Sequence, residues 1–471
     1  MAATRYAEIR NELLLRSFPN VFAPAVLRDA DSNYVPMPIS ERLVQCIWYD
    51  QRIHNLKTVD GQPVTVIFPG WWNLEAGPDF RHATVKVGDR DEVTGDVEIH
   101  LRADDWNHHR HGRDPLYDNV VLHVVLWDAG SESAPKTRHD DVIPQVALQN
   151  QLSASLEQLY DEIDTEAYPH EAGEHGGRCA AVLKNLPVET IAAMLESAGD
   201  ERFASKARKF SRWIHRAGPA QAFYEGWMEA LGYKANKSGF RALAQRLPVA
   251  GRPSAPILFG VANFLPTGLT DAYGKRLWGQ WWKLRPDFED KILPKDTWRL
   301  HGIRPQNHPH RRLGAAAALL KQHGNLLERV TGAIQSGGDP GTFFVKLRDD
   351  YWSHHFTLGG KAQRKACELI GAARAEEIIA NVVLPFVAAL DDDRLSAAAK
   401  ARYDALRRAP GNSVLRLAGQ QLFETPRIAA RLTRTTRQQQ GLMQIFQDFC
   451  LNDKSGCQQC HFPELVKRWS G

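Results

Sequence analysis

The chain of 471 residues predicts an α/β (α+β) protein, with a mixed sheet flanked by helices and then a mostly helical region. Apolar residues alternate with period two between Val64 and Leu101, and they recur at helical spacing from Pro187 onward. Three of the six cysteines lie close together near the C-terminus. These patterns predict an α/β domain at 1–160, a linker at 161–185, a helical domain at 186–440 and a Cys-rich motif at 441–471.

Two helices are expected before the sheet. The first covers about residues 6–15, and the second follows Ser40, whose hydroxyl is a good N-cap for the apolar pattern behind it. Strands are expected at 64–68, 83–87, 96–101 and 119–127, with a further one at 142–148. The polar segment 104–111 is expected to form a helical turn or two. From Ser40 the order is therefore helix, three strands, short helix, strand.

Loops and helices make up the remainder. Residues 128–141 and 164–178 are polar or rich in glycine and are expected to form loops. The strongest helical patterns lie at 188–216, 219–231, 238–246, 312–333, 363–388, 395–408 and 428–449. Breaks are expected at 250–256 and 336–341.

Charge and composition restrict the class of protein only loosely. The net charge of +4 allows nucleic acid as a partner without requiring it. No run of about 18 apolar residues exists, so no membrane-spanning segment is expected. The N-terminus lacks the apolar core of a signal peptide, and six cysteines in this length do not make a disulfide framework. A cytoplasmic location is expected.

A candidate metal site lies on two of the predicted strands. Asp79 begins one strand after Gly77-Pro78, and Glu98 lies on the next. Neighbouring strands are about 4.8 Å apart, so both carboxylates could share one cation. Hard carboxylate oxygens suit Mg²⁺ or Mn²⁺. His100 is two residues beyond Glu98 and therefore on the same strand face.

The nearby histidines offer a second version of this site. His108 and His111 are three residues apart and share a face if the segment is helical. Together with His100 and Glu98 or Asp79 they could bind zinc or iron. His123 lies within an apolar strand and is expected to be a hydrogen-bonded core side chain. The alternative without function is that Asp79 caps a turn, that Glu98 pairs with an arginine, and that the histidines are solvated.

The element order and these residues resemble the PD-(D/E)XK nuclease superfamily. Pro78-Asp79 matches its first element and Glu98-Ile99-His100 its second, with His100 at the lysine position. The resemblance implies that Asp79 and Glu98 hold the metal during phosphodiester hydrolysis of nucleic acid, and that His100 orients or deprotonates water. His108 or His111 would then contact the scissile phosphate. Some members carry a glutamate on the first helix, and Glu41 is the candidate here.

The C-terminal cysteines form a second metal-binding pattern. Cys450, Cys457 and Cys460 have the spacing C-x6-C-x2-C, which suits a 4Fe-4S cluster or Zn²⁺. The spacing is similar to the first three ligands of the cluster loop in helix-hairpin-helix DNA glycosylases, although Val466 stands at the fourth place. Cys179 is the preferred fourth ligand, and His461, Cys367 and Cys46 remain open alternatives.

Basic side chains in the helical region could contact nucleic acid. Arg202, Lys206 and Lys209 fall in one helical stripe bordered by Trp213, a combination that can hold a single strand by charge and stacking. Arg304 and Arg311 lie in the arginine- and histidine-rich segment 299–312 and could line a cleft. A solvated helix face and a rigid loop are the corresponding structural alternatives.

Over about residues 41–462 the chain resembles the bacterial DUF2851 family, which supplies no activity. The residues that carry this resemblance include Ile47-Trp48, Gly77-Pro78-Asp79-Phe80, Gly95 to His100, Asp105-Trp106, His109, His111, Tyr117, Asn119 to Val125, Arg304-Pro305 and Arg311-Arg312. Two other functions therefore stay open. One is a non-catalytic nucleic-acid-binding or scaffold protein with a structural metal, and the other is a zinc or iron enzyme acting on a small molecule.

Overall fold

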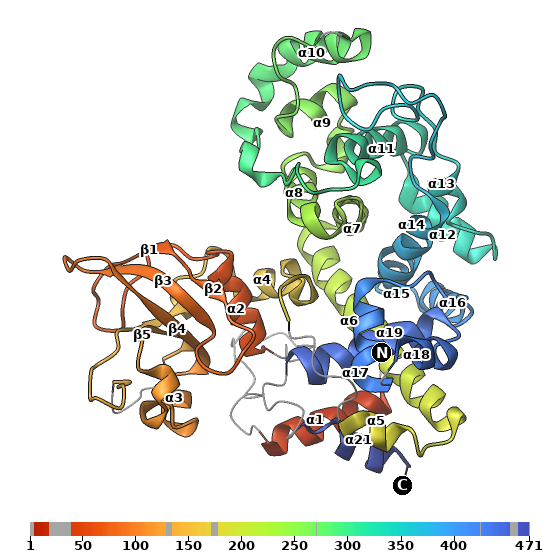
Figure 1. Ribbon diagram of the computed structural model, residues 1–471. Coiled ribbons are helices and arrows are strands. Elements are labelled where there is room, and N and C mark those ends of the chain that lie inside the picture. Colours follow the sequence, from red (N-terminus) through yellow and green to blue (C-terminus); the bar gives the residue numbers. More distant parts are fainter. Residues whose placement is uncertain are drawn as a thin grey trace. The chain divides into compact units, whose positions relative to one another are not determined.

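The computed structural model describes residues 4–17, 39–128, 134–170, 178–269, 271–423, 425–452 and 460–470. Among these, a six-stranded mixed sheet in the N-terminal part precedes a mostly helical region (Figure 1). The α/β class predicted from the sequence is confirmed. No described helix has both the length and the apolar character that crossing a membrane requires.

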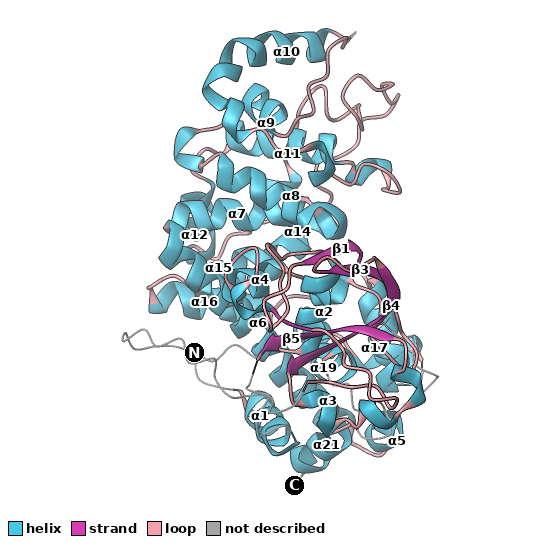
Figure 2. Ribbon diagram, turned by 90° about the vertical axis from the view of Figure 1, so that its left-hand side faces the viewer, coloured by secondary structure: helices cyan, strands magenta, loops and turns pink. Residues whose placement is uncertain are grey.

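The chain divides into two compact units, each built from segments that are distant in sequence. The sheet unit consists of residues 5–191, 413–429 and 443–471, and the helical unit consists of residues 1–4, 192–412 and 430–442. Residues near the C-terminus therefore belong to the same unit as the sheet. Figure 2 shows the strands gathered in one region of the molecule, with helices forming most of the rest.

The sheet contains β1 (Val64–Phe68), β2 (Trp71–Trp72), β3 (Phe80–Val87), β4 (Val93–Arg102), β5 (Val120–Trp127) and β6 (Gln145–Ala147). Its order is β1-β3-β4-β5-β6, and β2 also pairs with β3. The first three strands of this order are antiparallel, whereas β4, β5 and β6 run parallel. Parallel neighbours need a crossover. Between β4 and β5 it consists of α3 (Asp105–His108), η1 (His111–Arg113) and η2 (Pro115–Tyr117).

Helix α2 (Glu41–Tyr49) covers one face of the sheet. The hydroxyl of Ser40, the predicted N-cap, accepts the N–H of Leu43 at 3.4 Å. The side of α2 that faces the sheet packs against alternate residues of β4 and β5, which all point to that face. The members of this core include Leu43, Val44, Ile47, Trp48, Val97, Ile99, Leu101, Leu122, Val124 and Leu126.

The crossover between β4 and β5 packs on the face of the sheet that points away from α2. Trp106 of α3 and Tyr117 of η2 form a small core with Val120 and Ile143. The Trp106 indole donates to the carbonyl of Lys136 at 3.1 Å. As a result, β4 is buried on both faces from Gly95 to Leu101, and polar side chains on it must find partners inside the protein.

A β-bulge in β3 sets the register next to the candidate site. Phe80 pairs with Val97 but Ala83 pairs with Gly95, so β3 contains one extra residue between these two pairs. Within the bulge, His82 has φ +57° and its N–H donates to Asp96 at 3.1 Å. Phe80 pairs with Val97 in antiparallel strands, so the preceding residue, Asp79, lies opposite Glu98.

The other described helices of the sheet unit come from segments that are far apart in the sequence. They are α1 (Arg5–Ser17), η3 (Leu148–Asn150), α4 (Leu156–Glu162), η4 (Thr165–Ala167), α5 (Arg178–Leu183), α17 (Ser413–Phe423), the π-helical η10 (Gln447–Leu451) and α21 (Phe462–Ser470). α5 packs against both α17 and α21, and α1 packs against α21. The final helix is therefore integrated in this unit.

The helical unit is built around a large apolar core. Its helices are α7 (Pro219–Leu231), α8 (Tyr233–Arg246), η5 (Val249–Gly251), α9 (Ala255–Val261), α10 (Ala272–Leu284), η6 (Arg285–Lys291), η7 (Lys295–Thr297), η8 (Pro305–Asn307), α11 (Pro309–Gln322), α12 (Leu326–Gln335), α13 (Thr342–Val345), α14 (Ala372–Ile378), the π-helical η9 (Ile379–Val383), α15 (Leu384–Ala388) and α16 (Asp393–Asp404). The helices α6 (Val188–Ala217), α18 (Pro426–Leu432) and α19 (Thr436–Phe446) each contribute residues to both units.

Two glycines let α6 and α19 approach within backbone contact. A Cβ added to Gly441 would overlap the carbonyl oxygen of Leu195. A Cβ added to Gly199 would overlap the carbonyl oxygen of Arg437. Both overlaps are with backbone atoms, which cannot rotate away as a side chain can. Each helix therefore needs a glycine at this crossing.

Several predicted helices end earlier or begin later than the apolar pattern indicated. The predicted helix 312–333 is divided into α11 and α12 around Gly324-Asn325, and the predicted helix 363–388 begins only at Ala372. The predicted helix 428–449 is likewise divided between α18 and α19. The helices expected from the sequence did not include α9, α10, α17 and α21.

Candidate metal centre

Strand β4 delivers a carboxylate and an imidazole to one buried face of the sheet. Val97, Ile99 and Leu101 point into the core under α2, so Glu98 and His100 point to the opposite face. Glu98 is 4% exposed and His100 is 1% exposed. On the neighbouring parallel strand, His123 pairs with Glu98 and is fully buried. Three polar side chains thus meet on a face that water hardly reaches.

The crossover adds two more histidines. α3 ends at His108, and the next three residues turn the chain back over β4. Arg110 has φ +61°, a left-handed conformation that reverses the direction of the backbone between His109 and His111. His111 is buried, whereas His109 is exposed. His111 therefore joins the cluster from the protein interior, and His109 joins it from the solvent-exposed side.

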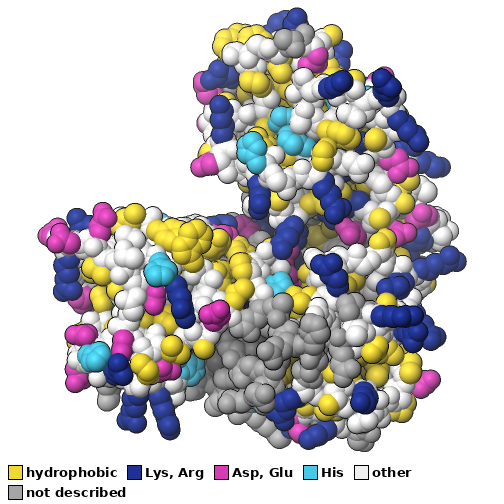
Figure 3. Space-filling model, in the orientation of Figure 1, with side chains coloured by type: hydrophobic (Ala, Val, Ile, Leu, Met, Phe, Trp, Pro, Cys, Tyr) yellow, Lys and Arg dark blue, Asp and Glu magenta, His cyan; other side chains and the backbone are white. Residues whose placement is uncertain are grey.

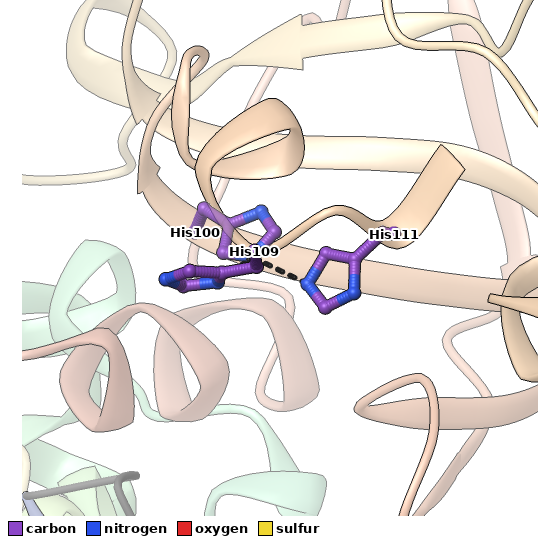
Figure 4. A group of neighbouring side chains, drawn as sticks. All are labelled: His100, His109 and His111. Carbon is purple, nitrogen blue, oxygen red and sulfur yellow. Dashed lines mark hydrogen bonds between the residues drawn. The ribbon is translucent and has the colours of Figure 1, made fainter. Parts of the chain in front are cut away.

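Three histidines converge (Figure 4), and Glu98 contacts two of them. His100 Nε2 lies 3.1 Å from His109 Nδ1 and 3.3 Å from His111 Nε2. Glu98 Oε1 lies 3.4 Å from His100 Nε2 and 3.6 Å from His111 Nε2. One nitrogen from each of the three histidines lies within 4.8 Å of the others. We call Glu98, His100, His109 and His111 the histidine cluster.

These spacings are those of ligands around a small cation. Zinc-type ions bind imidazole nitrogen and carboxylate oxygen at about 2.0–2.2 Å, so neighbouring ligands in a tetrahedron are separated by about 3.4 Å. The four separations given above for the histidine cluster run from 3.1 to 3.6 Å. Three imidazoles and one carboxylate are ligands that suit Zn²⁺, Fe²⁺ or Mn²⁺ better than Mg²⁺. The donor set and its spacing therefore fit such a metal.

A buried relay fixes which nitrogen of His100 faces the cluster. His123 Nδ1 lies 2.9 Å from Gln145 Oε1, and an amide oxygen can only accept, so this nitrogen carries the proton. Burial lowers the pKa of His123 to about 4, which keeps the ring neutral and leaves Nε2 as an acceptor. His100 Nδ1, 2.9 Å away, must then donate to it. In neutral His100, the lone pair of Nε2 consequently points into the cluster.

Asp79 supports Glu98 from the opposite strand. The Asp79 N–H donates to Glu98 Oε2 at 3.0 Å, and the Ile99 N–H donates to Asp79 Oδ2 at 3.1 Å. Gln45 on α2 donates to Asp79 Oδ1 at 2.8 Å. The two carboxylates are thus adjacent, but Glu98 directs Oε1 toward the histidines while Asp79 binds protein donors. In this geometry Asp79 positions β4 and Glu98.

The residues predicted from the sequence are brought together only in part. Glu98, His100 and His111 meet in the histidine cluster, and Asp79 lies beside it. The side chain of His108 is 66% exposed and lies 3.9 Å from Asp105. From α2 it is Gln45, one turn beyond the predicted Glu41, that reaches Asp79.

Single alanine variants distinguish His109 from His108 as the ligand. We expect His109→Ala to weaken metal binding by on the order of a hundredfold, because it removes one of four ligands. His108→Ala removes a neighbouring exposed imidazole and should leave the affinity within about twofold. Competition with a fluorescent chelator measures both. A loss confined to His108→Ala would contradict the arrangement of the cluster.

The predicted cysteine site lies partly outside the described residues, because Cys457 is not among them. Cys450 is on η10, and Cys460 lies two residues before the start of α21. Cys179 is on α5, where its thiol donates to the carbonyl of Gln421 at 3.5 Å. α5 packs against α21, so the preferred fourth ligand belongs to a helix next to the one that follows Cys460.

The predicted nucleic-acid-binding residues mostly have partners within the helical unit. Trp213 is 1% exposed, with the guanidinium of Arg241 3.9 Å from its ring centre. Arg202 and Lys206 both donate to Gln440, and Lys209 pairs with Glu229 at 3.5 Å. Arg311 is 1% exposed and holds the carbonyls of Trp352, Cys367 and Glu368. Arg304 is exposed at the start of η8.

Sequence reasoning missed three contributors to this site. They are the ligand candidate His109 and the orienting side chains Gln45 and Gln145. His109 follows His108 directly, and only the end of α3 decides which of the two turns inward. Gln145 lies opposite His123 because β5 and β6 pair in this register. Knowledge of that register would have revealed Gln145 as the partner of His123.

Comparison with known proteins identifies one matching family model. Its description is "Protein of unknown function (DUF2851)", and it matches residues 41–410. No curated protein and no solved structure matches the chain.

Proposed function

Since the chain belongs to the DUF2851 family, whose description states no activity, we propose from its geometry that it is a metal-dependent hydrolase of phosphodiester bonds in nucleic acid. The observation that carries this proposal is the convergence of Glu98 Oε1 with His100 Nε2 and His111 Nε2. The metal would be bound by the histidine cluster and would activate water and polarise a phosphoryl oxygen. The sequence predicted Mg²⁺ or Mn²⁺. Because three of the proposed ligands are imidazoles, we propose Mn²⁺, Zn²⁺ or Fe²⁺ instead.

The side chains of the cluster would have separate roles. Glu98 would supply the anionic ligand, and its second oxygen is held by the Asp79 N–H, so the carboxylate cannot rotate freely. His100 and His111 would be the buried ligands. His109 is exposed, so substrate and water would enter beside it.

Arginines near the cluster support an anionic substrate. Arg110, which separates His109 from His111, and Arg113 are both exposed. Two acids close by already have local partners: Asp105 accepts the N–H of Arg102 at 3.0 Å, and Asp114 accepts the N–H of Leu116 at 2.9 Å. The resemblance of the element order and of Asp79 and Glu98-Ile99-His100 to the PD-(D/E)XK nucleases supports phosphodiesters as the substrate class.

A nuclease assay with defined metals tests this proposal. The protein is stripped with a chelator, reloaded separately with Mn²⁺, Zn²⁺, Fe²⁺ or Mg²⁺, and incubated with labelled single- and double-stranded DNA and RNA. We expect cleavage by the wild type with at least one transition metal. Glu98→Gln, which keeps the shape of the side chain but removes its charge, should lower the rate by on the order of a hundredfold or more. Wild-type protein that binds metal yet cleaves none of these substrates would refute it.

A metalloenzyme that acts on a small molecule is the second candidate. The observation that favours it is the burial of the cluster, since Glu98 and His100 are at most 4% exposed. A polymer backbone needs a wider approach than a small substrate. Hydrolysis of a small aryl phosphodiester without cleavage of any oligonucleotide would support this alternative.

Removing the proton acceptor at the end of the relay should weaken metal binding. In Gln145→Leu, His123 Nδ1 loses its partner, so the tautomer of His100 is no longer fixed. Partners that orient metal-binding histidines typically contribute 10–100-fold in affinity. We expect a loss in that range, with partial recovery in Gln145→Glu, which keeps an acceptor oxygen. Isothermal titration measures both variants, and unchanged affinity in Gln145→Leu would eliminate the relay.

We retain the C-terminal cysteines as a second, structural metal site, with Cys179, Cys450, Cys457 and Cys460 holding a 4Fe-4S cluster or Zn²⁺. The packing of α5 against α21 supports Cys179 as the fourth ligand. Elemental analysis together with labile sulfide distinguishes iron–sulfur from zinc. Loss of that metal in Cys179→Ser, but not in Cys367→Ser, is the expected outcome.

A further inference from the structure

Helix α10 in the helical unit presents an unusual surface. Its buried residues are Gly274, Leu277 and Trp281. Beside this buried face, Lys275, Trp278 and Trp282 follow one another at spacings of three and four residues and therefore share a face. Trp282 is 55% exposed. Trp278 is half-buried, so the two tryptophans form a partly exposed aromatic patch, and contiguous patches of this kind mark interaction sites.

The two tryptophans on this face form a flat stack. The rings of Trp278 and Trp282 lie 5.2 Å apart and are tilted by only 9°. The Arg285 guanidinium lies 5.6 Å from the centre of the Trp282 ring. Gly279 is on the same side of the helix, and a Cβ placed there would meet nothing within 4 Å. The face is thus open as well as aromatic.

Positive charge surrounds the stack. Lys275, Arg276 and Lys283 are exposed. The sequence from Ala272 to Leu284 contains no acidic residue, although η6 immediately after it carries several. Figure 3, seen as in Figure 1, shows hydrophobic and basic side chains together where α10 lies. Stacked aromatic rings within a basic patch provide both interactions that a single-stranded nucleic acid uses.

We propose that the exposed face of α10 binds single-stranded nucleic acid. A base stacks on the Trp278–Trp282 pair, and phosphates lie against Lys275, Arg276 and Lys283. An anionic membrane is the less favoured occupant, because Leu277 is buried in the core, Leu284 packs against that core, and no continuous aliphatic face is left to insert. This site is distinct from the histidine cluster, and binding there does not depend on a metal.

Fluorescence anisotropy with a labelled oligothymidine of about 20 nucleotides tests the proposal, in a chelator that prevents cleavage. We expect Trp278→Ala/Trp282→Ala to lower the affinity by about tenfold or more. Trp278→Phe/Trp282→Phe keeps two stacking rings and should stay within about threefold. Lys275→Glu/Lys283→Glu should weaken binding and flatten the salt dependence, by about 0.7 in slope for each lost phosphate contact. The control Lys346→Glu/Lys361→Glu makes the same charge change at two exposed lysines outside α10.

The outcomes separate the possibilities. Equal affinity of the wild type and Trp278→Ala/Trp282→Ala overturns the proposal, as does binding of phosphatidylserine vesicles without any binding of the oligonucleotide. Circular dichroism of each variant confirms that the fold is retained. Because the readout is binding in the absence of metal, a failure here leaves the hydrolase proposal intact, and an inactive metal centre leaves this site intact.

Discussion

Replacing His100 by alanine is expected to reduce the metal affinity of the sheet unit by on the order of a hundredfold or more. The side chain would supply one ligand nitrogen, and it links the cluster to His123 and Gln145. If about 12 kcal/mol of binding is shared among four ligands, each contributes about 3 kcal/mol. The heat stability gained on adding metal should disappear in the same variant, because a ligand that binds the folded state stabilises it.

Two further variants make this result interpretable. His139→Ala removes an imidazole that is 60% exposed elsewhere in the sheet unit and should bind metal like the wild type. Glu98→Gln preserves the shape of the side chain, so a loss of metal there cannot be attributed to a cavity. Competition with a chelator and differential scanning fluorimetry provide the two measurements. Full retention of metal in both His100→Ala and Glu98→Gln would eliminate the histidine cluster as a metal site.

Gly441→Ala is expected to destabilise the helical unit by about 3 kcal/mol. The added methyl group would overlap the carbonyl oxygen of Leu195, and only separation of α6 from α19 relieves that overlap. The better helix propensity of alanine, about 1 kcal/mol, offsets only part of this cost. Gly199→Ala should behave similarly, since its methyl group would overlap the carbonyl oxygen of Arg437.

The matched control is the same substitution in an open helix. Gly332 lies within α12, and a Cβ there would meet nothing within 4 Å. Gly332→Ala should therefore raise stability by about 0.5–1 kcal/mol through propensity and a less flexible unfolded chain. Thermal unfolding followed by circular dichroism ranks the three proteins. If Gly441→Ala melts at or above the midpoint of Gly332→Ala, the close helix crossing is wrong.

The sheet could be predicted from the sequence because its signal is local. Period-two alternation located β1, β3 and β4, and the apolar run at 119–127 located β5. Helix boundaries were less predictable, since a glycine or asparagine such as Gly324 or Asn325 interrupts an apolar stripe without changing its period. The membership of residues 413–429 and 443–471 in the sheet unit depends on tertiary packing, which periodicity does not encode.

The residues of the candidate site were likewise predictable only where the sequence signal is local. Glu98 and His100 could be recognised because they are two residues apart on one strand and necessarily share a face. His109, Gln45 and Gln145 could not, since each depends on how a turn or a separate element is placed against β4. The role of Asp79 also needed the structure, because the β3 bulge sets which residue faces Glu98.

The alternation of the chain between the two units has a consequence for how the protein is made. A ribosome that has released residues 5–191 has not yet supplied the other two parts of the unit to which they belong, residues 413–429 and 443–471. The intervening stretch must be synthesised first, and no single cut in the gene yields either unit entire. Nascent chains halted before that point would carry a sheet without its closing helices, exposing apolar surface that invites chaperones and proteases.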